Sequence, residues 1–419
     1  MPVSERGYIP RVVDGVLGQL LQEFPAVLLI GPRATGKTTS ARRRARAVLS
    51  VDRPEQAAAL RAGPDAVLAS LPRPLLIDEW QLAPEVLGAV KRAVDSDPSP
   101  NQFLLTGSAR SDALAEGWPA TGRVLRVSQW GLTRREMDGD AGAPSFFDRV
   151  FAGVLPSAPS PATAPDVRDY LRYALGSGFP QMARATSGLA RRRWLDSYVS
   201  QLVARDAMLL GEARDPSRLR RYLQAIAANT AGIPEHKTLF DAAGLSRATA
   251  VAYDGVLELV LATEQVPAWT TSRLSRVART PKRYLVEPAL LGPLLGIDER
   301  ACLRDGDLLG RLMDTFVVSQ LRAERDVSEI APQLYHLRQE GGRREVDLLA
   351  EAPDGRVVAM EIKAAASVDR DDAKHLLWLR DRIGSAFVTG IVFHTGPLAY
   401  TLDEKIHALP VASIWATAG

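Results

Sequence analysis

Two hydrophobic patterns alternate over the first 150 residues of the chain. Short runs of consecutive apolar residues, typical of strands buried on both faces, are separated by stretches in which apolar residues recur at helical spacing. Because strands that alternate with helices form parallel sheets with right-handed crossovers, we predict an α/β domain over residues 1–150. The predicted strands are residues 26–30, 47–51, 74–77, 102–106 and 123–128.

The pattern changes after this region. Residues 154–165 are rich in Pro, Ser and Ala, which indicates a loop or linker, and helical spacing resumes near residue 166. We therefore predict a helical unit over residues 151–215, which we call the lid.

Residues 216–300 predict a small winged helix-turn-helix unit. A turn ends at Ser246, which is placed as the N-cap of a helix predicted over residues 247–260. Two short strand-like pieces follow, at residues 264–269 and 283–286, and would form the wing.

Residues 301–419 predict a second α/β domain, and no internal repeat is found in the chain. A helix opens this domain, and a turn at Asp354 and Gly355 predicts a hairpin between two of its strands. The strands are predicted at residues 333–338, 345–350, 357–362 and 387–394.

Composition narrows the class of protein. The chain has 46% hydrophobic and 24% charged residues, and its net charge of +3 is too small to indicate a nucleic-acid ligand by itself. Cys302 is the only cysteine, which excludes a disulfide framework and a zinc cluster built on cysteine. No apolar run approaches the roughly 20 residues of a membrane span, and the N-terminus lacks the order of a signal peptide. We expect a cytoplasmic location and no membrane contact.

A glycine-flanked loop follows the first predicted strand and leads into a helical pattern. This order of strand, loop and helix is the context in which main-chain N–H groups cradle the phosphates of ATP or GTP. Lys37 would add charge at the terminal phosphates, and the Thr38 hydroxyl would hold Mg²⁺. The predicted nucleotide-binding residues are Gly31, Pro32, Arg33, Ala34, Thr35, Gly36, Lys37, Thr38 and Thr39.

Polar side chains end two further strands of this sheet. Asp78 is predicted to hold the magnesium ion, and Glu79 to polarise the attacking water as a general base. The alternative is an exposed acidic pair at the start of the next helix. Thr106, followed by Ser108, is a candidate sensor of the γ-phosphate, unless it marks an ordinary strand exit. Arg123 is a candidate arginine finger that acts across a subunit interface, so a homo-oligomer is expected.

These motifs together resemble a widespread group of prokaryotic AAA+ ATPases that carry a C-terminal domain of unknown function. The resemblance covers nearly the whole chain and implies that the nucleotide is ATP. It also implies that Gly178 and Pro180, in a Gly-x-Pro element of the lid, contact this nucleotide. The chain departs from the pattern at Ala34, at Glu287 and at Asp314. The matching segments are Tyr8 to Arg11, Gly31 to Thr39, Ile77 to Glu79, Leu105 to Ser108, Gly122-Arg123, Gly178 to Pro180, Tyr198 to Asp206, Glu345 to Asp347 and Glu361 to Lys363.

The C-terminal domain carries a second set of candidate catalytic residues. Alternation along a strand places Glu361 and Lys363 on one face, where Asp347 could join them across the hairpin. This arrangement is similar to the PD-(D/E)xK nuclease fold, in which two carboxylates hold a metal and lysine activates water. Asp314, on the preceding helix, would add a carboxylate. The alternative is a nuclease-like scaffold that binds DNA or a partner without cutting.

The partner stays open between DNA and protein. The helix over residues 247–260 has few side chains suited to reading base edges, whereas the wing is basic. Other basic clusters, at residues 42–44 and 191–193, are interpreted as solvated helix faces. Our first hypothesis is an ATPase that remodels or translocates on DNA, and the alternative is a nucleotide-gated switch that controls a protein–protein interaction. The wing residues that could meet phosphates, or form a solvated basic loop instead, are Arg273, Arg276, Arg279, Lys282 and Arg283.

Overall fold

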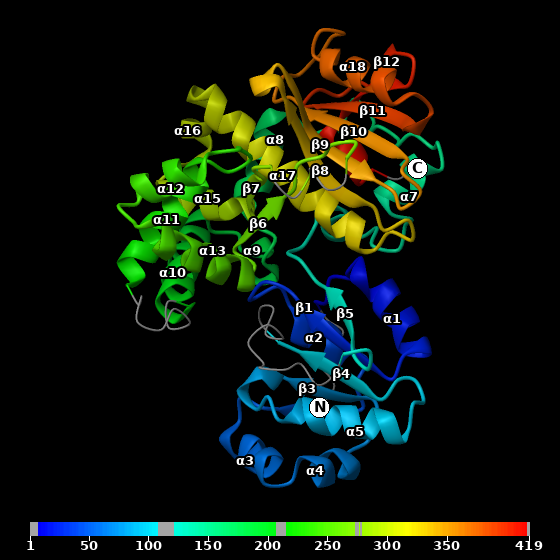
Figure 1. Cartoon of the computed structure of the whole chain (residues 1–419), viewed down its shortest axis with the longest axis vertical. Coiled ribbons are helices and arrows are strands. Elements are labelled where there is room, and N and C mark those ends of the chain that lie inside the picture. Colours follow the sequence, from blue (N-terminus) through cyan, green and yellow to red (C-terminus); the bar gives the residue numbers. More distant parts are fainter. Residues whose placement is uncertain (1–6, 108–120, 207–214, 273–275, 277–278, 417–419) are drawn as a thin grey trace. The chain divides into compact units, whose positions relative to one another are not determined.

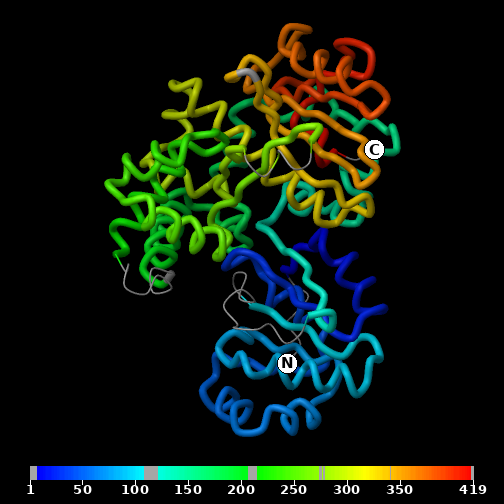
Figure 2. The backbone as a smooth tube through the Cα atoms, viewed as in Figure 1, coloured from blue at the N-terminus to red at the C-terminus, as the bar shows by residue number. Residues whose placement is uncertain are grey.

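Figure 1 shows the computed structural model of the chain, which describes residues 7–107, 121–206, 215–272, 276 and 279–416. Two compact units are present, and each is described by itself. The first comprises Met1–Leu132 and two short segments, Phe179–Gln181 and Leu259–Leu261, and the second comprises the remaining residues. The path of the backbone through both is traced in Figure 2.

The first unit is built on a five-stranded sheet in the order β2-β3-β4-β1-β5. All four of its strand pairs are parallel, which confirms the parallel α/β sheet expected from the sequence pattern. Its strands are β1 (Ala26–Ile30), β2 (Ala47–Ser50), β3 (Leu75–Asp78), β4 (Phe103–Thr106) and β5 (Leu125–Ser128).

The central strands of this sheet are apolar at successive positions because helices cover both faces. Alternate residues such as Leu28 and Ile77 belong to a buried cluster that includes residues of α3, α4 and α5. The intervening residues such as Val27 and Leu76 are also fully buried, and α1 and α2 pack on these strands. The helices are α1 (Val13–Glu23), α2 (Lys37–Arg42), α3 (Pro54–Ala62), α4 (Pro64–Ser70) and α5 (Val86–Ser96), with a short 3-10 turn η1 (Trp80–Leu82).

The second unit contains most of the helices that follow the first sheet. No helix in the described ranges is long and apolar enough to cross a membrane. Residues of the first unit begin α9 (Pro180–Ala183) and end α13 (Arg247–Leu259). The other helices are α6 (Arg134–Met137), α7 (Phe146–Phe151), α8 (Val167–Gly176), α10 (Gly188–Asp206), α11 (Pro216–Ala228), α12 (His236–Ala242), α15 (Leu291–Leu295), α16 (Glu299–Arg304), α17 (Gly306–Asp326) and α18 (Lys374–Ile383).

A two-stranded antiparallel sheet follows α11, α12 and α13. It consists of β6 (Thr263–Val266) and β7 (Lys282–Leu285), and the hydroxyl of Ser246 accepts from Thr249 N at the start of α13, as an N-cap does. The hairpin does not stand alone. Trp269 N donates to His336 O, and His336 N donates to Pro267 O, so the chain after β6 pairs with a strand of the next sheet.

That next sheet has six strands in the order β12-β13-β11-β10-β9-β8. The four predicted strands are present, and β9 and β10 form the expected antiparallel hairpin. Strands β12 and β13 were not predicted because they are short and their apolar pattern is weak. The strands are β8 (Gln333–Gln339), β9 (Arg344–Glu351), β10 (Val357–Ile362), β11 (Phe387–His394), β12 (Tyr400–Asp403) and β13 (Ile406–Pro410).

The structure groups residues 133–150 with the second unit, although the sequence pattern joined them to the first. The guanidinium of Arg135 donates to Glu324 on α17 at 3.0 Å, and both side chains are almost fully buried. The same Glu324 carboxylate accepts from Phe146 N at 2.7 Å, and Gln320 accepts from Arg134 N. A buried carboxylate requires such donors, so α6 and α7 are tied to α17.

Candidate functional site

The loop between β1 and α2 has a backbone that requires glycine at two positions. A Cβ on Gly31 would lie 2.0 Å from the carbonyl oxygen of Gln129, which is a backbone atom that cannot move aside. Gly36, at the N-terminal end of α2, has a φ of +88°, a conformation that L-residues rarely adopt. Glycine is therefore required at both positions of the loop for which the sequence predicts phosphate binding.

Two side chains from outside the motif hold this loop. The carbonyl oxygen of Thr35 accepts from Arg11 Nη1 at 2.8 Å and from Gln129 Nε2 at 2.9 Å. The Thr35 hydroxyl in turn donates to Pro32 O at 2.9 Å. Arg11 entered the sequence-based expectations only as part of a resemblance. Gln129 was missed, since no local pattern connects a residue after β5 to this loop.

Lys37 is buried within the loop, with 7% of its surface exposed. Its ammonium donates to Gly31 O at 3.0 Å and to Pro32 O at 2.7 Å. Burial lowers the pKa of Lys37 to about 8, although the charge of Glu79 opposes that shift. The charge of this ammonium is thus under-compensated in the unliganded protein, and an anionic ligand would stabilise it.

Three of the predicted site residues meet at one carboxylate oxygen. Asp78 Oδ1 accepts from Thr38 Oγ1 at 2.8 Å and from Thr106 Oγ1 at 2.5 Å. Asp78 ends β3, Thr106 ends β4 and Thr38 lies in the first turn of α2, so the parallel sheet brings them to one edge. A carboxylate and a hydroxyl at this separation are the hard oxygen donors that Mg²⁺ prefers, and the residues therefore fit the ion.

Glu79 lies next to this group, at the first position after β3. Its backbone is left-handed, with φ of +55°, and its carboxylate accepts from Gln81 Nε2 at 2.5 Å. A non-glycine residue in this conformation is uncommon and stores strain, which is typical of functional positions. The side chain is half-buried and is held by a neighbour rather than by the sheet.

The remaining predicted residues of the first site have different surroundings. Arg123 is partly exposed and pairs with Asp95 at 2.9 Å. Pro180 lies near the loop, since its Cγ is 3.6 Å from the place of a Cβ on Gly36. Ser108 lies outside the described residues. Gly178 N donates to Glu287 Oε2 at 3.2 Å, and burial raises the pKa of Glu287 to about 7.

The predicted nuclease residues of the C-terminal part are brought together, but a lysine lies among them. Asp347 Oδ2 accepts from Ile362 N at 3.1 Å, and Lys363 Nζ lies 3.6 Å from Glu361 Oε2. Lys282 Nζ is 2.5 Å from Asp314 Oδ2 and 3.1 Å from Asp347 Oδ1. Within the described ranges, no group of three or more His, Cys, Asp or Glu residues is placed to hold a metal ion.

The prediction of an exposed basic wing is wrong for three of its five residues. Arg276 pairs with Glu351, Lys282 with Asp314 and Arg283 with Asp254, and all three basic side chains are buried. The partners were not foreseen because they lie 29 to 75 positions away in sequence. Arg279 is exposed and donates to Arg338 O, and Arg273 lies outside the described residues.

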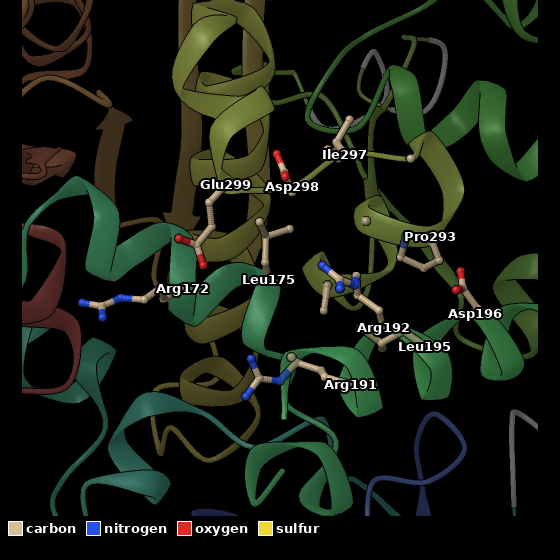
Figure 3. Close-up of a pocket in the computed structure, with 14 residues that line it drawn as sticks. Arg172, Leu175, Arg191, Arg192, Leu195, Asp196, Pro293, Ile297, Asp298 and Glu299 are labelled. Carbon is tan, nitrogen blue, oxygen red and sulfur yellow. The ribbon is translucent and has the colours of Figure 1, made fainter. Parts of the chain in front are cut away.

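A cavity of about 460 Å³ lies among α8, α10, α15 and the start of α16 (Figure 3). Part of the basic cluster at residues 191–193 lines it, because Arg191 and Arg192 are in its wall. Three acidic residues, Asp196, Asp298 and Glu299, balance these two and Arg172. The balanced charge gives the cavity no preference for an anion or a cation.

Comparison with protein families bears on the first unit directly. Residues 23–137 match the model of a family described as an AAA domain. This match supports the expected AAA-type ATPase domain in the first part of the chain. Two further models match the rest of the chain, both described as domains of unknown function: DUF8612 over residues 167–301 and DUF4143 over residues 309–414.

Relatives of this chain are found in two mycobacteria. An uncharacterized protein of Mycobacterium bovis and one of Mycobacterium tuberculosis are each 29% identical over 415 residues, which is 96% of this chain and 83% of theirs. Among solved structures, a Walker-type ATPase of Pyrococcus abyssi has a TM-score of 0.43 at 15% identity, covering 70% of this chain and 98% of its own. A mutant of Thermotoga maritima RuvB has a TM-score of 0.29 at 18% identity, covering 66% of this chain and 92% of its own. TM-scores this low carry no conclusion about function.

Replacing Gly31 by Ala tests the shape of the loop. The new Cβ would collide with Gln129 O, so we expect the substitution to cost about 1–3 kcal/mol and to lower the first thermal transition in circular dichroism. The matched control is Gly15→Ala, because nothing lies within 4 Å of that position on α1. The control should be neutral or slightly stabilising. Equal melting curves for the two variants would contradict the loop geometry.

Proposed function

We propose that the AAA domain binds ATP together with Mg²⁺ and hydrolyses the nucleotide. The observation that carries this proposal is the shared oxygen of Asp78, to which Thr38 and Thr106 both donate, beside the buried Lys37 ammonium. Hydroxyl, carboxylate and ammonium then surround the end of a loop whose main chain presents N–H groups. This combination suits a triphosphate and its cation better than any other common ligand.

Each side chain has a role that follows from its surroundings. Lys37 would exchange its two carbonyl acceptors for phosphate oxygens, and Thr38 and Asp78 would hold the magnesium ion. That ion supplies charge neutralisation at the β- and γ-phosphates. Glu79 accepts the proton of the attacking water, and Thr106 orients that water from the end of β4. Arg11 and Gln129 keep the loop in place through Thr35 O.

Glu79→Gln separates binding from turnover. The amide keeps the shape of the side chain but cannot take a proton, so we expect ATP to bind normally and hydrolysis to fall by about 100-fold or more. Fluorescent ATP-analogue titration and phosphate release measure the two steps. The control is Glu85→Gln, an exposed acid a few residues further along the chain. Loss of ATP binding in Glu79→Gln would reassign this carboxylate to the metal or to the fold.

The pKa of Lys37 sets the pH dependence of ATP binding. Only the protonated ammonium attracts phosphate, and with a pKa of about 8 roughly one tenth of the unliganded protein carries it at pH 9. We therefore expect the dissociation constant for ATP to rise about tenfold between pH 7 and pH 9, measured in Glu79→Gln to prevent turnover. A constant affinity over this range would show that Lys37 keeps its charge without ligand.

We propose DNA as the substrate on which hydrolysis acts, with a nucleotide-gated switch between proteins as the second candidate. Arg42 and Arg43 on the first unit, and Arg192 and Arg193 on the second, are exposed and support the DNA proposal. The burial of Arg276, Lys282 and Arg283 supports the switch, because the wing has little charge left for phosphates.

The ATPase rate with single-stranded, duplex and branched DNA distinguishes these two candidates. If DNA is the substrate, we expect stimulation of at least several-fold that falls steeply with salt, since each phosphate contact releases counterions. Arg192→Ala combined with Arg193→Ala should weaken it, whereas Arg300→Ala, on a different helix, is the control. Indifference of the rate to every DNA would favour the switch.

A further inference from the structure

Lys282, on β7, is the most deeply buried ammonium group among the described residues of the second unit. Only 2% of its surface is exposed. Its Nζ donates to Asp314 Oδ2 at 2.5 Å, to Asp347 Oδ1 at 3.1 Å and to the carbonyl oxygen of Asp347 at 3.4 Å. The three oxygens come from α17 and β9, so the ammonium is surrounded by groups that lie far from it in the sequence.

Further groups fix the carboxylates that hold this ammonium. Tyr284 donates to the second oxygen of Asp314 at 3.0 Å, which orients that carboxylate. Glu361 on β10 is hydrogen-bonded to Asp347 and is 95% buried. Its Oε1 atom is also buried, and no donor lies within hydrogen-bonding distance of it. Two carboxylates, from α17 and β9, thus contact Lys282, while the third carboxyl group, Glu361, contacts Asp347 and lies 3.6 Å from Lys363 Nζ. The Oε1 atom of Glu361 can still accept a hydrogen bond.

The cation reaches this site from outside the six-stranded sheet. Successive side chains of a strand point to opposite faces, and β7 uses both of them. Arg283 makes two bonds to Asp254 on α13, of 2.8 and 3.0 Å, while Lys282 enters the carboxylate cluster. Pro267 and Trp269, which follow β6, pair with His336 of β8 and hold the hairpin against the sheet. Docking of this hairpin therefore places Lys282 in the cluster.

We propose that Lys282 is the resident cation of this carboxylate cluster and that it excludes divalent metal ions while β7 is docked. An ammonium nitrogen at 2.5 to 3.1 Å from two carboxylates occupies the space in which an ion would need oxygens at about 2.0 to 2.6 Å. Its charge also repels the ion at a short distance. The inference does not depend on ATP hydrolysis by the first unit, and it makes metal chemistry at Asp347 and Glu361 conditional on movement of β7.

Manganese binding to the nucleotide-free full chain tests this directly. Mn²⁺ prefers oxygen ligands, and its free concentration is measured by electron paramagnetic resonance. We expect the wild type to have no Mn²⁺ site that depends on Asp347. Lys282→Met removes the charge at similar length and should gain one site, at least about tenfold tighter than any in the wild type. Lys374→Met, which removes an exposed lysine, is the matched control and should gain none.

A second substitution assigns the site. Adding Asp347→Asn to Lys282→Met should abolish the gained Mn²⁺ site, which separates it from any ion bound by Asp78 in the first unit. Wild-type protein that binds Mn²⁺ as tightly as Lys282→Met, with the same dependence on Asp347, would overturn the proposal. Folded Lys282→Met that gains no site would overturn it as well.

The outcome is also decisive if the variant does not fold without metal. Loss of the ammonium leaves Asp314 and Asp347 buried without a counter-charge, which is strongly destabilising. Millimolar Mn²⁺ should then restore cooperative melting of Lys282→Met in circular dichroism and leave the wild-type melting temperature unchanged. Lys282→Met that stays unfolded in Mn²⁺ would overturn the proposal, because the cluster would then require lysine itself rather than a cation.

Discussion

A buried ammonium group needs oxygen atoms around it, and each unit of this chain contains one such lysine. Lys37 in the first unit is surrounded mainly by main-chain carbonyls, and burial lowers its pKa to about 8. Lys282 in the second unit lies between carboxylates. Burial opposes its charge too, but Asp314 and Asp347 hold the pKa of Lys282 well above its ordinary value. The two lysines therefore differ in how far neighbouring groups compensate their charge.

This difference separates a site that needs a ligand from one that does not. The charge of Lys37 becomes fully compensated only when an anion enters the glycine-flanked loop, where main-chain N–H groups and the Thr38–Asp78 pair complete the surroundings. The carboxylates around Lys282 already have their counter-charge, supplied by a neighbouring hairpin of the same chain. We therefore expect nucleotide binding in the first unit as it stands, and metal binding in the second only after β7 moves.

Much of the first unit could be predicted because its signals are local. An apolar strand followed by a loop of fixed spacing predicts a phosphate-binding loop, and the parallel sheet places the ends of β3 and β4 beside it. Asp78 and Thr106 were named because each ends a strand of the sheet that carries this loop. Gln129 was missed because its bond to Thr35 joins residues 94 positions apart, and no pattern around either residue reports it. Strands β12 and β13 were missed because their short segments resemble loops.

The sequence by itself determined the strand–loop–helix unit, the parallel type of the first sheet and the residues that can carry charge. Periodicity and glycine positions act over a few neighbours, so they can be read without knowing the fold. The tertiary structure determined which charged side chains are buried in ion pairs and which are exposed. Lys282 and Arg283 read as a basic wing, yet β7 directs one to Asp314 and the other to Asp254. Whether a charged group is solvated or buried depends on segments distant in the chain, and only the folded structure brings them together.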